Sequence, residues 1–179
     1  MTNPIEIRPT GFADAKLLVR PAHRDERGEF RRVFSQSEYA VAGVHDAFVE
    51  DNVSVSRRGV LRGLHYDFRL AKFVQVLRGE IYDVIVDINK GSETYGRWEG
   101  FALTAAGCEQ LYVPRGFAHG FYVLSETAIV AYKQTAAYDP ACEGGIRWND
   151  PAIGISWPLT GEPIVSAKDR AAPLLAGVP

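Results

Sequence analysis

The sequence predicts an all-β protein, either a sandwich or a barrel, and three observations support this prediction. Short runs rich in β-branched and aromatic residues recur along the chain, and turn signals separate them at short intervals. Only one stretch has the pattern of a helix. No internal repeat, low-complexity tract or Pro/Ser-rich linker divides the 179 residues. Many short strands with little helix are typical of β-sandwiches and β-barrels, so we expect one domain over residues 1–179.

The one predicted helix is short and lies near the N-terminus, at residues 35–42. Ser35 and Glu38 have the S-x-x-E spacing of a capping box, in which each side chain bonds the other residue's backbone N–H. Phe34 and Tyr39 are spaced as a hydrophobic staple across the first turn. Gly43 is suited to end the helix in a left-handed conformation.

The first clear strand is FVEDNVSVS at residues 48–56, in which apolar and polar residues alternate. Side chains in a strand point to opposite faces in turn, so the two kinds of residue are expected on different faces, one of them wet. The apolar face holds Val49, Val53 and Val55, and the polar face holds Glu50, Asn52 and Ser54.

Two further strands are predicted within residues 73–89, joined at Arg78-Gly79, and another at residues 127–135. In the second strand of the pair, Asp83 and Asp87 alternate with isoleucines on one face. Carboxylates among apolar residues indicate a barrel whose lumen holds a polar ligand.

The composition excludes several classes of protein. With 46% hydrophobic and 23% charged residues the chain can bury a sizeable core, unlike a disordered, collagen-like or coiled-coil chain. A net charge of −2, from 20 Lys+Arg and 22 Asp+Glu, argues against nucleic acid as a partner. No secretion signal or membrane span is evident, so we expect a soluble cytoplasmic protein with no membrane partner. Its two cysteines, Cys108 and Cys142, are expected to be reduced.

The densest polar cluster is basic and lies in residues 57–72. It contains Arg57, Arg58, Arg62, His65 and Lys72. Arginine suits phosphate, and histidine exchanges protons near pH 7, so the cluster indicates an anion site with proton chemistry. The alternative is a solvated basic loop with a hydrogen-bonded core histidine.

A proline-glycine turn, VPRG, delivers His119 to the start of an aromatic-rich strand. Such turns also occur in metal-binding cupins, which require three or four convergent ligands. The chain lacks an HxH pair, and its histidines lie far apart in sequence: His23, His45, His65 and His119. We therefore expect no metal.

Seven motifs occur in order along the chain. They are VLRGLHY (60–66), AKFVQVLRGEIYDVIVDI (71–88), SETYG (92–96), VPRGFAHGFYVLSE (113–126), YKQTAAYDP (132–140), IRWNDPAIGISWP (146–158) and SAKD (166–169). Together, over residues 5–175, they closely resemble the dTDP-4-dehydrorhamnose 3,5-epimerase family. The resemblance implies a cupin-like β jelly-roll barrel, a homodimer, no metal or organic cofactor, and epimerisation of a nucleotide-diphosphate-linked 4-keto-6-deoxy sugar.

Inverting a carbon beside a carbonyl requires a base, a cation for the enolate and an acid on the opposite face. The resemblance assigns the base to His65, which Asp169 orients. It places Lys72 beside the developing enolate oxygen and makes Tyr132 the opposing acid. It also implies substrate-binding residues, which are Arg62, His119, Asn52, Glu50, Tyr138, Arg27 and Arg32.

Regular strand alternation would place Arg62 and His65 on opposite faces, although both must reach one cavity. Gly63 between them permits a bulge or bend that redirects its neighbours.

The chain departs from the family pattern mainly where nucleotide and sugar bind. Glu29 and Arg32 stand where relatives carry other residues, Glu50 and Asp67 replace glutamines, and the loop from Asp67 to Lys72 is short. The resemblance makes dTDP-4-dehydro-6-deoxyglucose the leading substrate, but a GDP- or CDP-linked keto sugar stays open, as does inversion of C3, C5 or both. Two other classes also stay open: a non-catalytic sugar-binding cupin and a metal-dependent cupin isomerase or oxygenase.

Overall fold

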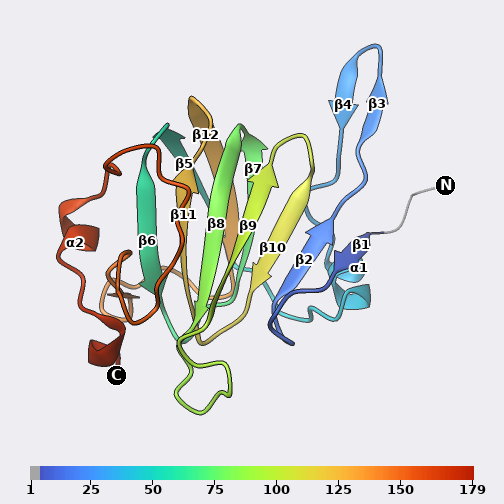
Figure 1. Ribbon diagram of the computed structural model, residues 1–179. Coiled ribbons are helices and arrows are strands. Elements are labelled where there is room, and N and C mark those ends of the chain that lie inside the picture. The colour runs from blue at the N-terminus through green and yellow to red at the C-terminus, as the bar shows by residue number, and fades with distance from the viewer. Residues whose placement is uncertain (1–4) are drawn as a thin grey trace.

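The computed structural model describes residues 5–179, which form two facing β-sheets and a projecting hairpin (Figure 1). One sheet has six strands in the order β1-β2-β10-β7-β12-β5, the other has five in the order β13-β6-β11-β8-β9, and β3 and β4 form the hairpin. The strands are β1 (Glu6–Arg8), β2 (Lys16–Val19), β3 (His23–Asp25), β4 (Gly28–Phe30), β5 (Glu50–Arg57), β6 (Leu61–Tyr66), β7 (Lys72–Arg78), β8 (Glu80–Asp87), β9 (Trp98–Thr104), β10 (Glu109–Val113), β11 (Phe117–Val123), β12 (Thr127–Gln134) and β13 (Gly144–Gly145). The all-β prediction is confirmed.

The predicted strands at residues 73–89 and 127–135 are confirmed as β7, β8 and β12. β7 and β8 belong to different sheets, and the chain crosses between them at Gly79. Gly79 has a φ of +83°, and an added Cβ would lie 2.1 Å from the carbonyl oxygen of Thr127. This crossing therefore requires glycine.

The main core fills the space between the sheets. Ile81, Ile85, Leu103 and Val130 are fully buried there and come from both sheets. A smaller cluster lies on the outside of the six-stranded sheet, where Tyr39 stacks on Phe73 at 4.2 Å between ring centroids and α1 (Gln36–Val41) covers the strands.

α1 confirms the predicted helix, but the capping box is wrong. Phe34 and Tyr39 pack edge to face at 5.3 Å, and Gly43 follows the helix with a φ of +78°, as expected. Ser35 makes no side-chain capping bond. The reason is that Glu38 accepts hydrogen bonds from two arginine side chains, Arg20 and Arg32, which are stronger partners than a backbone N–H.

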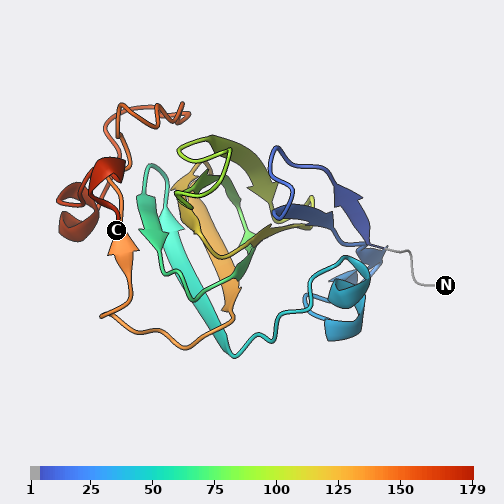
Figure 2. The same cartoon turned by 90° about the horizontal axis from the view of Figure 1, so that it is seen from below.

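The prediction of a single helix was also wrong, because the C-terminal segment holds α2 (Ala167–Arg170) and a short 3₁₀ helix, Leu175–Gly177. Four residues are too few to show helical periodicity in a sequence. Ser166 caps α2 by accepting a bond from the backbone N–H of Asp169. This segment lies against the β6 side of the sandwich, opposite the N-terminal strands and α1 (Figure 2).

The predicted alternation in β5 is confirmed, and its apolar face is the exposed one. Val53 and Val55 are 61% and 63% exposed on the outside of the sheet. Asn52 and Ser54 face the space between the sheets instead. The lumen is therefore polar at this edge of the sandwich.

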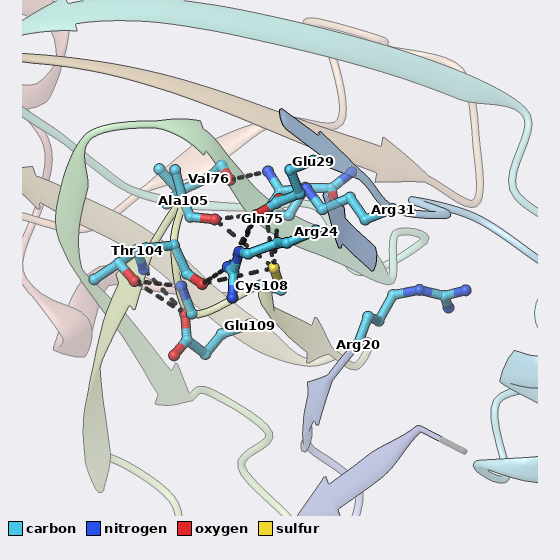
Figure 3. Close-up of polar contacts among 12 residues, drawn as sticks. Arg20, Arg24, Glu29, Arg31, Gln75, Val76, Thr104, Ala105, Cys108 and Glu109 are labelled. Carbon is cyan, nitrogen blue, oxygen red and sulfur yellow. Dashed lines mark hydrogen bonds and ion pairs between the residues drawn. The ribbon is translucent and has the colours of Figure 1, made fainter. Parts of the chain in front are cut away.

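The β3–β4 hairpin projects beyond the sheets (Figure 1). Arg31 anchors its base, because the guanidinium donates to the carbonyl oxygens of Ala105 and Val76 and to Cys108 Sγ (Figure 3). The hairpin itself is exposed at every residue of its two strands. Among residues 5–179, no helix has the length and apolar character needed to cross a membrane.

Candidate active site

A cavity of about 350 Å³ lies between the two sheets, and most of the predicted site residues line it. Its walls come from β5, β6, β7, β11 and β12 and from the segment after β12. The lining residues are Glu50, Asn52, Ser54, Arg62, His65, Lys72, His119, Gly120, Phe121, Tyr132, Gln134, Tyr138 and Glu143.

His65 and Asp169 form a close pair at one wall of the cavity. Nε2 of His65 lies 2.6 Å from Oδ1 of Asp169, although the two residues are 104 positions apart. The carboxyl also accepts from the backbone N–H of Gly63. Burial favours the neutral acid, but the hydrogen bonds from His65, Gly63 and Ser166 outweigh it and lower the pKa of Asp169. The carboxylate therefore stays charged and can stabilise a proton on His65.

Arg62 and His65 both line the cavity, as the argument about Gly63 required. Gly63 has a φ of +115°, and the pairing of β6 with β11 shifts register between His119 and Phe121. A Cβ on Gly63 would lie 2.6 Å from the Cα of Gly120, so no other residue fits.

Lys72 and Tyr132 reach the cavity from the other sheet, on β7 and β12. Burial lowers the pKa of Lys72, while the negative charges of Glu143, Asp67 and Asp83 oppose this shift. Burial raises the pKa of Tyr132, and the charge of Arg62 partly opposes it. The phenol accordingly holds its proton at neutral pH.

His119 lies beside His65 on the neighbouring strand and has its own carboxylate partner. The two histidines are in register between β11 and β6. Nε2 of His119 lies 3.0 Å from each oxygen of Asp83, which is completely buried. Burial raises the pKa of Asp83, and the charges of His119 and Lys72 oppose this shift.

Glu50, Asn52 and Tyr138 all line the cavity, and hydrogen bonds join them. Oε1 of Glu50 accepts from Nδ2 of Asn52 at 2.8 Å, and its Oε2 accepts from the backbone N–H of Tyr138 at 3.1 Å. Near Tyr138, the exposed thiol of Cys142 donates to Asp139. Asp67, the other departure from the family pattern, is buried and bonds Arg69 outside the cavity wall.

Two predicted binding residues do not reach the cavity of their own chain. Arg27 is 85% exposed on its side chain and pairs with Asp25, two residues away. Arg32 pairs with Glu38. The basic cluster is also divided, because Arg57 and Arg58 are exposed outside the cavity while its other members line it.

Sequence reasoning missed several lining residues. Ser54 and Gln134 continue the rows of Asn52 and Tyr132 at a spacing of two, so strand periodicity was a usable signal. Ser54 Oγ and Gln134 Oε1 have no hydrogen-bond partner within the described residues. Glu143 lies outside the regular strands, so no sequence pattern marked it as a lining residue. Its carboxylate pairs with Lys168, the residue before Asp169.

No group of three or more His, Cys, Asp or Glu side chains within residues 5–179 is arranged to hold a metal ion. Both cysteines are free thiols, as expected; Cys108 is buried and Cys142 exposed.

Comparison with known proteins gives consistent matches. The family model described as dTDP-4-dehydrorhamnose 3,5-epimerase matches residues 9–177. The enzyme of that name from Methanothermobacter thermautotrophicus is 46% identical over 162 residues, 88% of each chain. A dTDP-4-dehydrorhamnose 3-epimerase from Streptomyces niveus is 38% identical over 96% of this chain and 84% of its own. A Legionella pneumophila 3,5-epimerase, crystallised with dTDP-4-keto-L-rhamnose, superposes with a TM-score of 0.95 and 44% identity, covering 98% of this chain and 95% of that one.

Proposed function

The chain belongs to the dTDP-4-dehydrorhamnose 3,5-epimerase family, a family of isomerases, and on that premise we propose that its cavity epimerises a dTDP-linked 4-keto-6-deoxy sugar. The observation that carries the proposal is the placement of His65 and Tyr132 on opposite sheets with the cavity between them. A sugar ring lying between the sheets would present one face to each residue. Inversion needs this arrangement, because the proton leaves one face and returns to the other.

In the first step, His65 takes the proton from the carbon next to the C4 carbonyl, and the electron pair of that C–H bond moves onto the carbonyl oxygen. The resulting enolate is negative, so it requires a cation nearby. Lys72 lines the same cavity and supplies one. Asp169, 2.6 Å from His65, stabilises the positive charge that the imidazole gains.

In the second step, the enolate takes a proton from the phenol of Tyr132 on the opposite face, and the carbonyl reforms. The raised pKa of Tyr132 keeps the phenol protonated until this step. Solvent then reprotonates the phenolate and removes the proton from His65. Repetition at the second carbon flanking the carbonyl gives the double inversion.

The nucleotide end of the substrate lies toward Arg62 and Tyr138 in this proposal. Arg62 is held in place by Ser56, whose Oγ accepts from Nε at 2.9 Å, and its remaining N–H groups suit a diphosphate.

Arg27 and Arg32 join the site only in a homodimer, where the β3–β4 hairpin of one copy reaches the cavity of its partner. Because its proposed substrate is a nucleotide sugar, we also assign the enzyme to the cytoplasm.

An apolar groove beside the hairpin supports the homodimer. The groove has a volume of about 310 Å³ and is lined in part by Ile7, Phe30 and Val41. Phe30 and Val41 are 72% and 88% exposed, which is unusual for large apolar side chains. A second copy of the chain would cover them and bring the hairpin arginines to a cavity.

Proton NMR of candidate nucleotide sugars in deuterated water tests the proposal. The enzyme is expected to exchange the sugar protons at C3, C5 or both of dTDP-4-keto-6-deoxyglucose, and the GDP- and CDP-linked sugars serve as comparison. Exchange that requires an added metal would contradict the mechanism, and absence of exchange with every 4-keto sugar would remove it.

A further inference from the structure

Asp83 is a buried carboxylate that the mechanism above does not use. It lies in the middle of β8 on the face that carries Ile81 and Ile85, and none of its surface is exposed. Its neighbours across the sheet are Phe121 on β11 and Phe101 on β9. A carboxylate in such surroundings costs stability unless a charged partner compensates it.

Asp83 has two compensating partners, and both line the cavity. Nε2 of His119 lies 3.0 Å from each of its oxygens, and no other hydrogen bond reaches them from the rest of residues 5–179. Lys72 is close enough that its positive charge favours the ionised carboxyl. His119 and Lys72 therefore both act on one carboxylate, although they belong to different sheets.

The contact leaves only one nitrogen of His119 for a ligand. Because Nε2 faces Asp83, Nδ1 is the ring nitrogen that can reach the cavity. An imidazole whose second nitrogen is held by a carboxylate keeps a fixed ring orientation. Lys72, whose charge also acts on Asp83, is the cation that the proposed function places beside the enolate oxygen.

We propose that Asp83 is a positioning residue that holds His119 so that Nδ1 and the ammonium of Lys72 converge on the carbonyl oxygen of the bound sugar. This inference rests on the proposed function and extends it. With Nε2 donating to Asp83, Nδ1 can donate to the sugar oxygen only when the ring carries both protons, and the carboxylate of Asp83 compensates that positive charge. Two donors aimed at one developing oxyanion then stabilise it better than one, and a fixed ring needs no reorganisation during the reaction. The cavity then contains two imidazole–carboxylate pairs with different roles. His65 and Asp169 move a proton, whereas His119 and Asp83 stabilise charge.

Asp87 provides a matched control on the same strand and the same face. It is almost as buried, at 2% exposed, but its oxygens accept from Ser92, Thr94 and the backbone of Asn89 in the loop that follows. If Asp83 only supports the fold, its substitution should have the same effects on stability and turnover as substitution of Asp87. If Asp83 acts on the cavity, the two substitutions should differ in their effect on turnover.

The experiment compares Asp83→Asn with Asp87→Asn by melting temperature and by turnover of the keto sugar. We expect Asp83→Asn to lower kcat about 10- to 100-fold, as loss of a partner behind a functional histidine typically does, with a smaller change in KM and little change in melting temperature. Asp87→Asn should lower the melting temperature and leave kcat nearly unchanged. Equal kcat losses in both variants, or an unchanged kcat in Asp83→Asn, would overturn the proposal.

A double-variant cycle asks whether Asp83 acts through His119. In a His119→Gln background, Asp83→Asn should cost little further activity, because residues that act as a unit are not additive. If the two losses of activity multiply, Asp83 does not act through His119, and the proposal is overturned. If Asp83→Asn does not fold, Asp83→Ser replaces it; if neither folds, Asp83 is a folding residue and the proposal is overturned.

Nitrogen-15 NMR of the imidazole rings separates this inference from the proposed function. Asp83→Asn should change the ring-nitrogen signals of His119 and leave those of His65 in place, whether or not a substrate turns over. If wild-type protein exchanges no sugar proton, the proposed function fails, and the nitrogen-15 signals alone then decide whether Asp83 positions His119. Unchanged His119 signals would overturn the positioning role.

Discussion

The cavity and the β3–β4 hairpin hold their predicted functional residues in different ways. In the cavity, His65 and Asp169 meet at 2.6 Å although 104 positions separate them, because β6 and α2 are packed together. On the hairpin, Arg27 pairs with Asp25, two positions away, and its side chain is 85% exposed. One chain therefore brings together the residues that we propose for proton transfer, whereas its hairpin is exposed.

Under the proposed function and the proposed homodimer, residues of the cavity carry out the sugar chemistry and residues of the hairpin recognise the nucleotide. Changes in the cavity should act on kcat within one chain. Changes on the hairpin should act on KM and should depend on which subunit carries them. Substitutions in the two regions should therefore be distinguishable by kinetics.

The largest effect is expected from His65→Ala. Loss of a general base typically costs about 100- to 10,000-fold, so solvent exchange at the sugar carbons should nearly disappear. The fold and nucleotide binding should persist, because His65 is half-buried at a cavity wall and its removal leaves the main core intact. Deuterium incorporation measures the first effect and a dTDP titration the second. Retention of more than a tenth of wild-type exchange would rule out His65 as the base.

Tyr132→Phe should separate the two steps of the reaction. Abstraction by His65 continues and the same residue returns the proton, so deuterium should enter with retained configuration while inversion falls about 100-fold. The ratio of exchange to inversion in deuterated water is the measurement. A tyrosine with only a structural role would lower the melting temperature and leave that ratio unchanged.

Asp169→Asn keeps the shape of the side chain and removes its charge. We expect turnover to fall about 10- to 100-fold, since the imidazole loses the carboxylate that stabilises its protonated form. Combined with His65→Ala, the substitution should add little, because the two residues act as a unit. Fully multiplicative losses would show that Asp169 acts independently of His65.

The smallest effect is expected from Arg27→Ala on the hairpin. Its KM should rise about tenfold with kcat unchanged, the loss expected for one hydrogen bond to a phosphate. Arg8→Ala removes another exposed arginine, on β1, and is the control that should change neither constant.

Mixing the Arg27→Ala and His65→Ala proteins then tests which chain the hairpin serves. If it reaches the partner's cavity, hybrid dimers contain one site with an intact hairpin and an intact base, so a low-KM activity should return. No such recovery, from subunits shown to exchange, would mean that the hairpin serves its own chain or neither.

Much of this arrangement was predictable from local patterns. The β-branched runs located β7 and β8, and the glycine between Arg62 and His65 was enough to predict the bend at Gly63. The alternation in β5 was equally clear, but it could not show which face was buried, because periodicity separates two faces without identifying the lumen.

Other features depend on distant contacts that no local pattern contains. Asp83 could be placed on a face of its strand, but its partner His119 is 36 positions away, so the pair could not be predicted. Glu38 has the spacing of a capping residue, yet Arg20, from 18 positions earlier, binds it instead. Tertiary ion pairs overrode the local signal in this case.

The exposed thiol of Cys142, which precedes the cavity-lining residue Glu143 in the chain, offers an attachment point for a spectroscopic reporter. The chain has two cysteines and Cys108 is buried, so a maleimide fluorophore should modify Cys142 selectively without engineering. The hydrogen bond to Asp139 raises the pKa of the Cys142 thiol, so labelling should be slow near pH 7 and faster in mildly alkaline buffer. Because Tyr138 and Glu143 on either side line the cavity, the attached dye would report substrate arrival in real time, ahead of the first proton transfer.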